Sequence, residues 1–172
     1  YIQSLRDTDK KHPDKLKIIA QRGGQERMLS IDADIKIVGG SRGGSKSFSS
    51  LMEVLKDIKN PDFHATILRN EKDDLQSLVT FGTYNKSQND MTWNFDNGGW
   101  LKFSYYAGAY QDFKTRFQGR QYAYVCIDEG TQCPYKKFKY LLTNNRNAAH
   151  IRNRFWITCN PDPESWVRKF ID

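Results

Sequence analysis

Glycine, lysine and serine are concentrated in one segment, which reads GGSRGGSKS over residues 39–47. A short apolar run precedes this segment, and an amphipathic run follows it. Because glycine has no Cβ, consecutive backbone N–H groups in such a segment can curl around an anion. Lys46 then supplies a positive charge for the β- and γ-phosphates, and Ser47 a hydroxyl for Mg²⁺, at the start of a helix. The segment therefore predicts a binding site for ATP and Mg²⁺.

One position in this segment departs from the common template GxxxxGK[ST]. When the chain is aligned on that template from Gly40, Ser45 stands where the second glycine is expected. We expect Ser45 to be tolerated there if its φ stays negative. The alternative is a surface turn rich in glycine and serine, which the flanking strand-like and helical runs disfavour. The residues assigned to the nucleotide are Gly40, Ser41, Arg42, Gly43, Gly44, Ser45, Lys46 and Ser47.

Two adjacent carboxylates, Asp128 and Glu129, follow the most apolar run of the chain, YAYVCI at residues 122–127. Ligands of open α/β folds bind at the carboxyl ends of the strands, where this pair is expected to lie. We expect Asp128 to hold Mg²⁺ through its water shell and Glu129 to orient and deprotonate the attacking water. A charge pair at a helix N-terminus is the alternative interpretation. Together with the glycine-rich segment, the pair favours nucleotide hydrolysis.

A third polar side chain, Asn160, follows a strand-like run within ITCNPD at residues 157–162. Its amide would face the γ-phosphate and could sense the loss of that group. An ordinary Asn-Pro turn is the alternative.

Strand-like and helix-like runs alternate along the chain and must position these residues. The sequence predicts strands at 34–38, 65–68, 122–127 and 155–158, helices at 46–58 and 134–142, a polar helix-like stretch up to residue 79, and a helical pattern from residue 166. Alternating runs at 91–95 and 100–103, separated by Asp-Asn-Gly-Gly, predict a β-hairpin. This order indicates an α/β fold with a mainly parallel central sheet flanked by helices.

Composition limits the alternatives further. The 172 residues suffice for one domain with a single core, and the net charge of +7 favours a polyanionic partner. Apolar runs stay shorter than a membrane span and no leader is recognisable, so we expect no membrane partner. The three cysteines lack zinc-site spacing, which favours reduced thiols in a cytosol-like compartment.

Five stretches resemble the N-terminal ATPase domain of the large terminase subunit, the DNA-packaging motor of tailed bacteriophages. They are DIKIVGGSRGGSKS, NPDFHATILRN, FQGRQYAYVCIDEGTQ, KYLLTNNRN and ITCNPDPESWVRKFID. The resemblance runs from about Gln25 to Asp172 and implies a P-loop NTPase of the ASCE type over residues 25–172. Residues 1–24 are then a lead-in, and the C-terminal nuclease domain of that family is not part of the sequence.

The resemblance also implies roles for individual residues. Lys46 and Ser47 would bind phosphate and Mg²⁺, Asp128 would be the metal-side carboxylate, and Glu129 the catalytic base. The stretch 158–160 would couple hydrolysis to DNA movement. A glutamine near the adenine is also expected, and of Gln21 and Gln25 we favour Gln25.

An arginine should stabilise the charge that develops on the γ-phosphoryl group, in cis or from a neighbouring subunit. Four arginines are candidates, in the order Arg42, Arg146, Arg120 and Arg116. For each arginine taken singly, a surface ion pair is the favoured interpretation over this role, because exposed arginines are common.

The predicted function is ATP hydrolysis that drives double-stranded DNA into a viral procapsid. The resemblance implies a homo-oligomeric ring on the portal protein, work with the small terminase subunit, a location in the host cytoplasm, and no nuclease activity in this part. One alternative is another P-loop nucleic-acid motor, such as a helicase or a recombination ATPase. A second is a nucleotide-binding scaffold domain that does not hydrolyse ATP, against which the presence of Glu129 argues.

Overall fold

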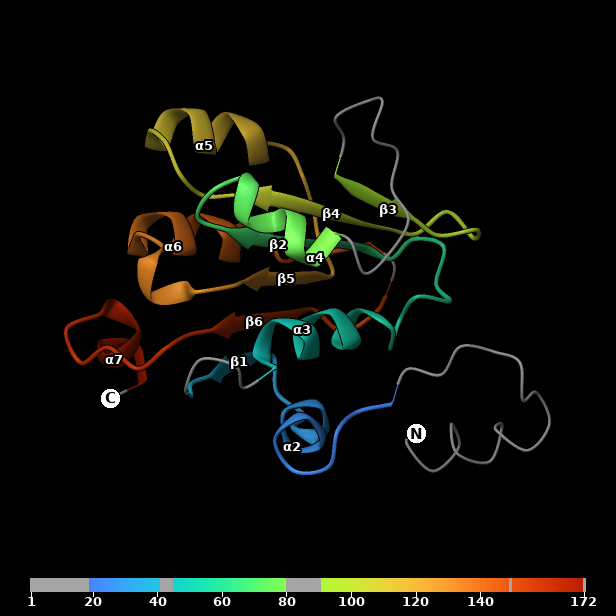
Figure 1. Cartoon of the computed structure of the whole chain (residues 1–172). Coiled ribbons are helices and arrows are strands. Elements are labelled where there is room, and N and C mark those ends of the chain that lie inside the picture. The colour runs from blue at the N-terminus through green and yellow to red at the C-terminus, as the bar shows by residue number, and fades with distance from the viewer. Residues whose placement is uncertain (1–18, 41–44, 80–90, 149, 172) are drawn as a thin grey trace.

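A central six-stranded sheet dominates the computed structural model, which describes residues 19–40, 45–79, 91–148 and 150–171 (Figure 1). The strand order is β1-β6-β5-β2-β4-β3, and all neighbours are parallel except the antiparallel pair β3-β4. The strands are β1 (Ile35–Val38), β2 (His64–Arg69), β3 (Thr92–Asn94), β4 (Trp100–Tyr105), β5 (Tyr124–Ile127) and β6 (Arg154–Thr158). The α/β class and the mainly parallel sheet are confirmed.

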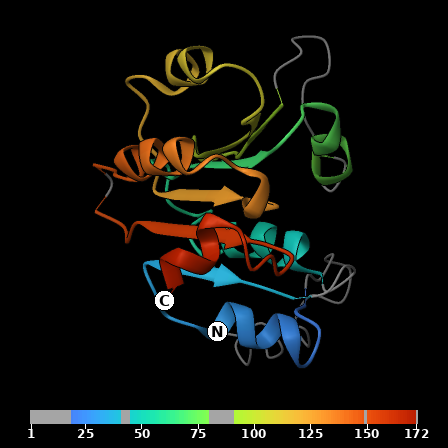
Figure 2. The same cartoon turned by 90° about the vertical axis from the view of Figure 1, so that its left-hand side faces the viewer.

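Helices cover both faces of this sheet, as Figures 1 and 2 show. They are α2 (Gly24–Ser30), α3 (Lys46–Val54), α4 (Gln76–Val79), α5 (Tyr110–Phe117), α6 (Tyr135–Asn144) and α7 (Trp166–Ile171), with short 3₁₀ turns η1 (Asp73–Leu75) and η3 (Gly130–Gln132). One apolar core lies between the sheet and α3, η1 and α4, and a second lies between the sheet and α5 and α6. None of the helices in the described ranges is long and apolar enough to cross a membrane.

The central strand β5 shows why this sequence forms a sheet with two covered faces. Tyr124 and Cys126 belong to the core beneath α3, whereas Val125 and Ile127 belong to the core beneath α5 and α6. All four side chains are buried. An uninterrupted apolar run is typical of such a parallel strand, and this strand carries the carboxylates at its end.

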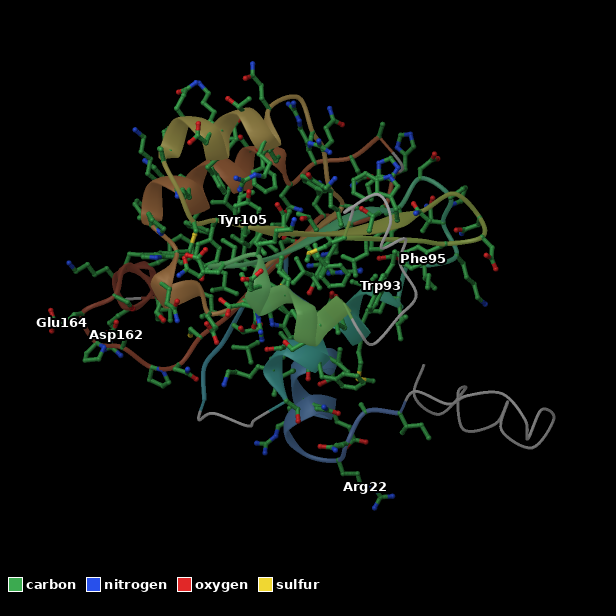
Figure 3. The ribbon with its side chains drawn as sticks, turned by 45° about the horizontal axis from the view of Figure 1, so that its top comes forward. Arg22, Trp93, Phe95, Tyr105, Asp162 and Glu164 are labelled. Carbon is green, nitrogen blue, oxygen red and sulfur yellow. The ribbon has the colours of Figure 1, made fainter. Side chains whose placement is uncertain are left out.

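The predicted hairpin is present as β3 and β4. Phe95 N–H donates to the carbonyl oxygen of Gly99 at 2.9 Å and closes the turn. Trp93 and Phe95, both labelled in Figure 3, pack against the core that α3 and α4 cover. Since β4 also pairs in parallel with β2, the hairpin extends the main sheet.

Some boundaries differ from the prediction. The helix predicted at 46–58 ends at Val54, because the next residues close tight turns in which Leu55 N–H donates to Met52 O and Lys56 N–H donates to Glu53 O. Helices α2 and α5 were not predicted. In α5 the buried side chains are Phe113 and Phe117, which is too little apolar periodicity to stand out from a polar stretch.

Candidate nucleotide site

A cavity of about 460 Å³ opens at the carboxyl ends of the parallel strands. In Figure 1 this edge of the sheet lies on the left, where α3 begins and β5 and β6 end. The lining residues are Ser45, Lys46, Ser47, Phe48, Arg69, Asp128, Glu129, Gln132, Thr158, Cys159 and Asn160. The volume lies in the range of small-molecule sites. The three motifs singled out in the sequence therefore meet in one cavity.

Lys46 is the first residue of α3, and its side chain reaches back toward the preceding loop. Its Nζ donates to the carbonyl oxygen of Gly40 at 3.1 Å and to Oδ1 of Asn160 at 3.4 Å. One ammonium group thus joins the loop after β1 to the residues after β6. A compact charge with three donors in this position suits the binding of phosphate oxygens.

Asp128 directly follows β5, and its side chain is 1% exposed. Ser47 Oγ donates to its Oδ1 at 3.0 Å, and Thr158 Oγ1 donates to the same oxygen. Arg69 Nε donates to the other oxygen, Oδ2, at 2.7 Å. A buried carboxylate is costly unless it is paired and hydrogen-bonded, so these three partners explain how Asp128 is accommodated beneath the cavity.

Glu129 adopts a left-handed backbone conformation with φ of 58°. Its N–H donates to Thr158 Oγ1 at 3.1 Å, and its Oε2 accepts a hydrogen bond from Gln132 Nε2 at 3.1 Å. At Gly130, the next residue, a Cβ would overlap the side chain of Ile157 in β6. The chain therefore turns tightly against β6, and this turn directs the half-buried Glu129 carboxylate into the cavity.

The Tyr106 side chain supports this turn through its hydroxyl group. Its hydroxyl lies within hydrogen-bond distance of the carbonyl oxygens of Asp128 (3.3 Å) and Glu129 (3.1 Å). Burial raises the pKa of Tyr106 above its usual value, and the neighbouring Cys133 and the two carboxylates act in the same direction. The hydroxyl therefore remains a protonated donor to the backbone of the carboxylate pair.

The expectation for Ser45 is corrected by the structure. Ser45 has φ of 55°, not a negative value, and it precedes α3 at the N-cap position. A non-glycine residue in this left-handed region is strained by roughly 1–2 kcal/mol. Its carbonyl oxygen accepts hydrogen bonds from both the N–H and the Oγ of Ser49 at 2.9 Å, which keeps the conformation in place. Ser45 thus adopts a left-handed backbone conformation that glycine would adopt without strain.

Arg69 is a site residue that the sequence reasoning missed. It is the last residue of β2 and contacts Asp128 and Ser47 through Nε and Nη2. A signal was available, because Arg69 ends the apolar run HATILR in the same way as the carboxylates follow β5. A polar residue at the carboxyl end of any parallel strand is a candidate for the ligand site of such a fold.

The remaining predicted nucleotide-binding residues are either outside the described ranges or away from the cavity. The loop residues Ser41, Arg42, Gly43 and Gly44 fall outside the described ranges. Gln25 is buried in α2, where its Oε1 accepts a hydrogen bond from Gln21 N–H at 2.7 Å, and neither side chain lines the cavity.

Three of the four candidate arginines are described, and none of the three lines the cavity. Arg146 is exposed after α6. The Arg116 guanidinium lies 3.7 Å from the ring centroid of Tyr105, and Arg120 Nε donates to the carbonyl oxygen of Arg116 at 2.9 Å. A role for any of them at the γ-phosphate would therefore require a neighbouring subunit or movement of the chain.

The donors present fit a magnesium ion that is shared with a nucleotide. Within the described ranges no group of three His, Cys, Asp or Glu side chains could hold a metal by itself. Ser47 Oγ and Asp128 Oδ1, in contrast, lie 3.0 Å apart at the cavity wall. Mg²⁺ prefers such hard oxygens and usually takes one or two of them together with water and substrate phosphates.

Solved structures with the same fold come from bacteriophage packaging proteins. The large terminase of a thermophilic bacteriophage matches with a TM-score of 0.64 and 18% identity, covering 86% of this chain and 41% of that one. The same phage's terminase in complex with ATP-γ-S matches with a TM-score of 0.58 and 19% identity, covering 85% and 40%. The large terminase ATPase domain of Thermus phage P74-26 matches with 0.60 and 13%, covering 88% and 69%. At these identities the likeness shows the fold.

A glycine-rich segment after β1 and paired carboxylates after β5, on a mainly parallel sheet, are typical of a P-loop NTPase. Strand β6 lies between the two strands that carry these motifs, as in the ASCE type of this fold. Residues 37–172 match the family described as terminase large subunit, T4likevirus-type, N-terminal. The chain therefore belongs to the large terminase family. It spans about two fifths of the length of the thermophilic phage terminase, and no curated protein sequence matches it.

Proposed function

We propose that this chain is the ATP-hydrolysing part of a viral genome-packaging motor, in which hydrolysis drives double-stranded DNA into a procapsid. The observation that carries the proposal is the meeting of Lys46 and Ser47 with Asp128, Glu129 and Asn160 in one cavity. Family membership supports the packaging role. The thermophilic phage terminase that was solved with ATP-γ-S supports the choice of nucleotide.

Binding of the triphosphate would use the loop before α3 and the start of that helix. Lys46 Nζ would exchange its contacts with Gly40 and Asn160 for phosphate oxygens, because an ammonium gains more from anionic acceptors than from neutral ones. Ser47 and Asp128 would hold Mg²⁺, which supplies neutralising charge to the β- and γ-phosphates. Gln25 is proposed to lie near the adenine.

Hydrolysis needs a group that takes a proton from the attacking water. Glu129 faces the cavity, and Thr158, Gln132 and Tyr106 hold its backbone and carboxylate. It would orient the water and accept its proton. Asn160, which contacts Lys46, would sense whether the γ-phosphate is present and pass this on through β6.

An arginine would complete the charge balance at the γ-phosphate. Arg42 in the phosphate loop and Arg146 after α6 are the first choices, followed by Arg120 and Arg116. The last three lie away from the cavity and would act on a neighbouring subunit.

The wider partners follow from the family. We propose a homo-oligomeric ring that works with the portal protein and the small terminase subunit in the cytoplasm of the infected host. The net charge of +7 would help the ring to track the DNA backbone without sequence preference. No nuclease activity is proposed for this part of the protein. A helicase or a recombination ATPase would share the same cavity, but family membership favours packaging.

The test replaces the base and compares it with a matched surface carboxylate. Glu129→Gln should lower ATP turnover by about 10²–10⁴-fold, the usual contribution of a general base, while ATP-γ-S affinity is kept. Lys46→Ala should abolish nucleotide binding. The control is Glu164→Gln, because Glu164 projects from the loop before α7, away from the rest of the molecule (Figure 3).

Turnover should be measured at high protein concentration, so that neighbouring copies can supply an arginine. Unchanged turnover in Glu129→Gln would show that another group is the base. If Lys46→Ala bound ATP-γ-S as tightly as the wild type, the proposed phosphate-binding role of the segment before α3 would be contradicted.

A further inference from the structure

All three guanidinium nitrogens of Arg69 donate hydrogen bonds, some toward the cavity and others toward η1 and α4. On the cavity side, Nε donates to Asp128 Oδ2 at 2.7 Å and Nη2 donates to Ser47 Oγ at 3.4 Å. On the other side, Nη1 donates to the carbonyl oxygen of Asp74 at 2.8 Å and to Ser77 Oγ at 3.1 Å. The side chain is 17% exposed. One guanidinium therefore links the candidate Mg²⁺ ligands to η1 and α4.

The two groups on the cavity side are those that the proposed function assigns to Mg²⁺. Arg69 takes Oδ2 of Asp128, the oxygen that Ser47 and Thr158 leave free. A divalent cation at Ser47 and Asp128 would place like charge beside the guanidinium. Because Asp128 is buried, solvent screens this repulsion weakly. The contacts of Arg69 and those of Mg²⁺ therefore compete.

We infer that Arg69 is a positioning residue that exchanges with Mg²⁺ as the cation neutralising Asp128, an inference that rests on the proposed function. Before the metal binds, the hydrogen bond from Arg69 Nε to Oδ2 keeps the Asp128 carboxylate in place. When Mg²⁺ arrives with the nucleotide, Arg69 leaves Ser47 and Asp128. Arginine suits this role because burial does not remove its charge.

The Nη1 contacts give this exchange a structural consequence. Arg69 closes its link to η1 and α4 through Asp74 and Ser77, which lie five and eight residues further along the chain. A guanidinium that moves away from Asp128 must shift or break these contacts. Loading of the cavity is therefore transmitted to residues 73–79.

The main experiment measures how ATP-γ-S binding depends on Mg²⁺ in three variants. In Arg69→Gln the Mg²⁺ concentration at half-saturation should fall roughly tenfold, a usual size for coupled sites, because the competing charge is gone. Arg69→Lys should give a smaller decrease. Arg152→Gln is the matched control, since Arg152 pairs with Asp32 and Asp34 away from the cavity, and it should behave as the wild type.

A second readout uses thermal unfolding and hydrogen exchange. In EDTA, Arg69→Gln should unfold at a lower temperature than the wild type, and Mg²⁺ with ATP-γ-S should raise its midpoint by more. In the wild type the same ligands should speed amide exchange in residues 73–79. Unchanged exchange there would overturn the transmission to this segment. If Arg69→Gln does not fold, Arg69→Lys carries the test.

The outcomes separate the two proposals. A wild-type chain that binds no ATP-γ-S at any Mg²⁺ concentration contradicts the proposed function itself. Binding in the wild type, with the same Mg²⁺ dependence in Arg69→Gln and Arg69→Lys, overturns only the exchange.

Discussion

Two buried carboxylates lie near opposite ends of α3, and their surroundings differ. Asp128 accepts from Ser47 at the start of the helix, whereas Glu53 is part of its last turn. Both are at most 1% exposed. Asp128 lies at the wall of the cavity, whereas Glu53 is not among the residues that line it.

Glu53 is surrounded by cations of the protein itself. Its carboxylate lies 3.3 Å from Lys36 Nζ, 2.8 Å from Lys56 Nζ and 3.1 Å from Arg154 Nε. Arg154 also pairs with Asp57. Burial lowers the pKa of Lys36, and the Glu53 carboxylate opposes this effect. These contacts tie α3 to β1 and β6.

The surroundings of a buried charge thus separate a structural role from a functional one. Around Glu53 every partner is a protein cation and the backbone is helical. Around Asp128 the partners are two hydroxyls and one arginine that face a cavity, and its neighbour Glu129 and the loop residue Ser45 have left-handed backbones. The left-handed backbones and the cavity are thus found together at the end of α3 where a ligand is expected.

Replacing Glu53 tests the ion pairs at the C-terminal end of α3, and it should have the largest effect on stability. Glu53→Gln leaves three cations facing a neutral side chain, so the free energy of unfolding should fall by about 3–5 kcal/mol in urea titrations. Affinity for ATP-γ-S, measured on the folded protein, should stay within error. Glu164→Gln on the surface is the control. A small loss of stability together with a large loss of affinity would contradict a purely structural role for Glu53.

Removing the Tyr106 hydroxyl tests the support of the carboxylate pair at the cavity. Tyr106→Phe loses the donor to the backbone of Asp128 and Glu129, so stability should fall by about 1 kcal/mol. Turnover should decrease more than nucleotide affinity, because Glu129, the proposed base, is less well placed. The control is Tyr140→Phe, whose hydroxyl contacts Lys114 O at 3.5 Å in α5. Equal losses of turnover in both variants would contradict a specific role for Tyr106.

The smallest expected effect concerns strain at the start of α3. Ser45→Gly should raise the free energy of unfolding by up to about 1 kcal/mol, because glycine adopts positive φ without strain. Ser49→Gly, within the same helix, should instead lower it by at least about 0.5 kcal/mol. Both can be compared in one urea titration series. A loss of stability in Ser45→Gly would show that φ at this position costs nothing.

The sequence predicted those features that depend on one segment at a time. The helix that begins at Lys46, the carboxylates after β5 and the hairpin each carry a local pattern of apolar spacing, charges or alternation. Arg69 and Lys36 were missed because a cation in a strand is ordinary until its partner is known, and both partners come from distant segments. The φ of Ser45 depends on how the chain enters α3, which no local pattern reveals. Helices α2 and α5 were too polar or too short to be recognised.

The pairing of β1 has a consequence for how the protein is made. Its registered partner in the sheet is β6, with Ile35 opposite Phe155, so most of the chain separates the two strands. During synthesis, β1 leaves the ribosome well before β6 and stays unpaired on that side until β6 follows. Such distant pairings form slowly and leave apolar segments exposed in the meantime. The segment that follows β1 is thus translated well before the strand that anchors it, so chaperones should meet this protein with β1 still unpaired.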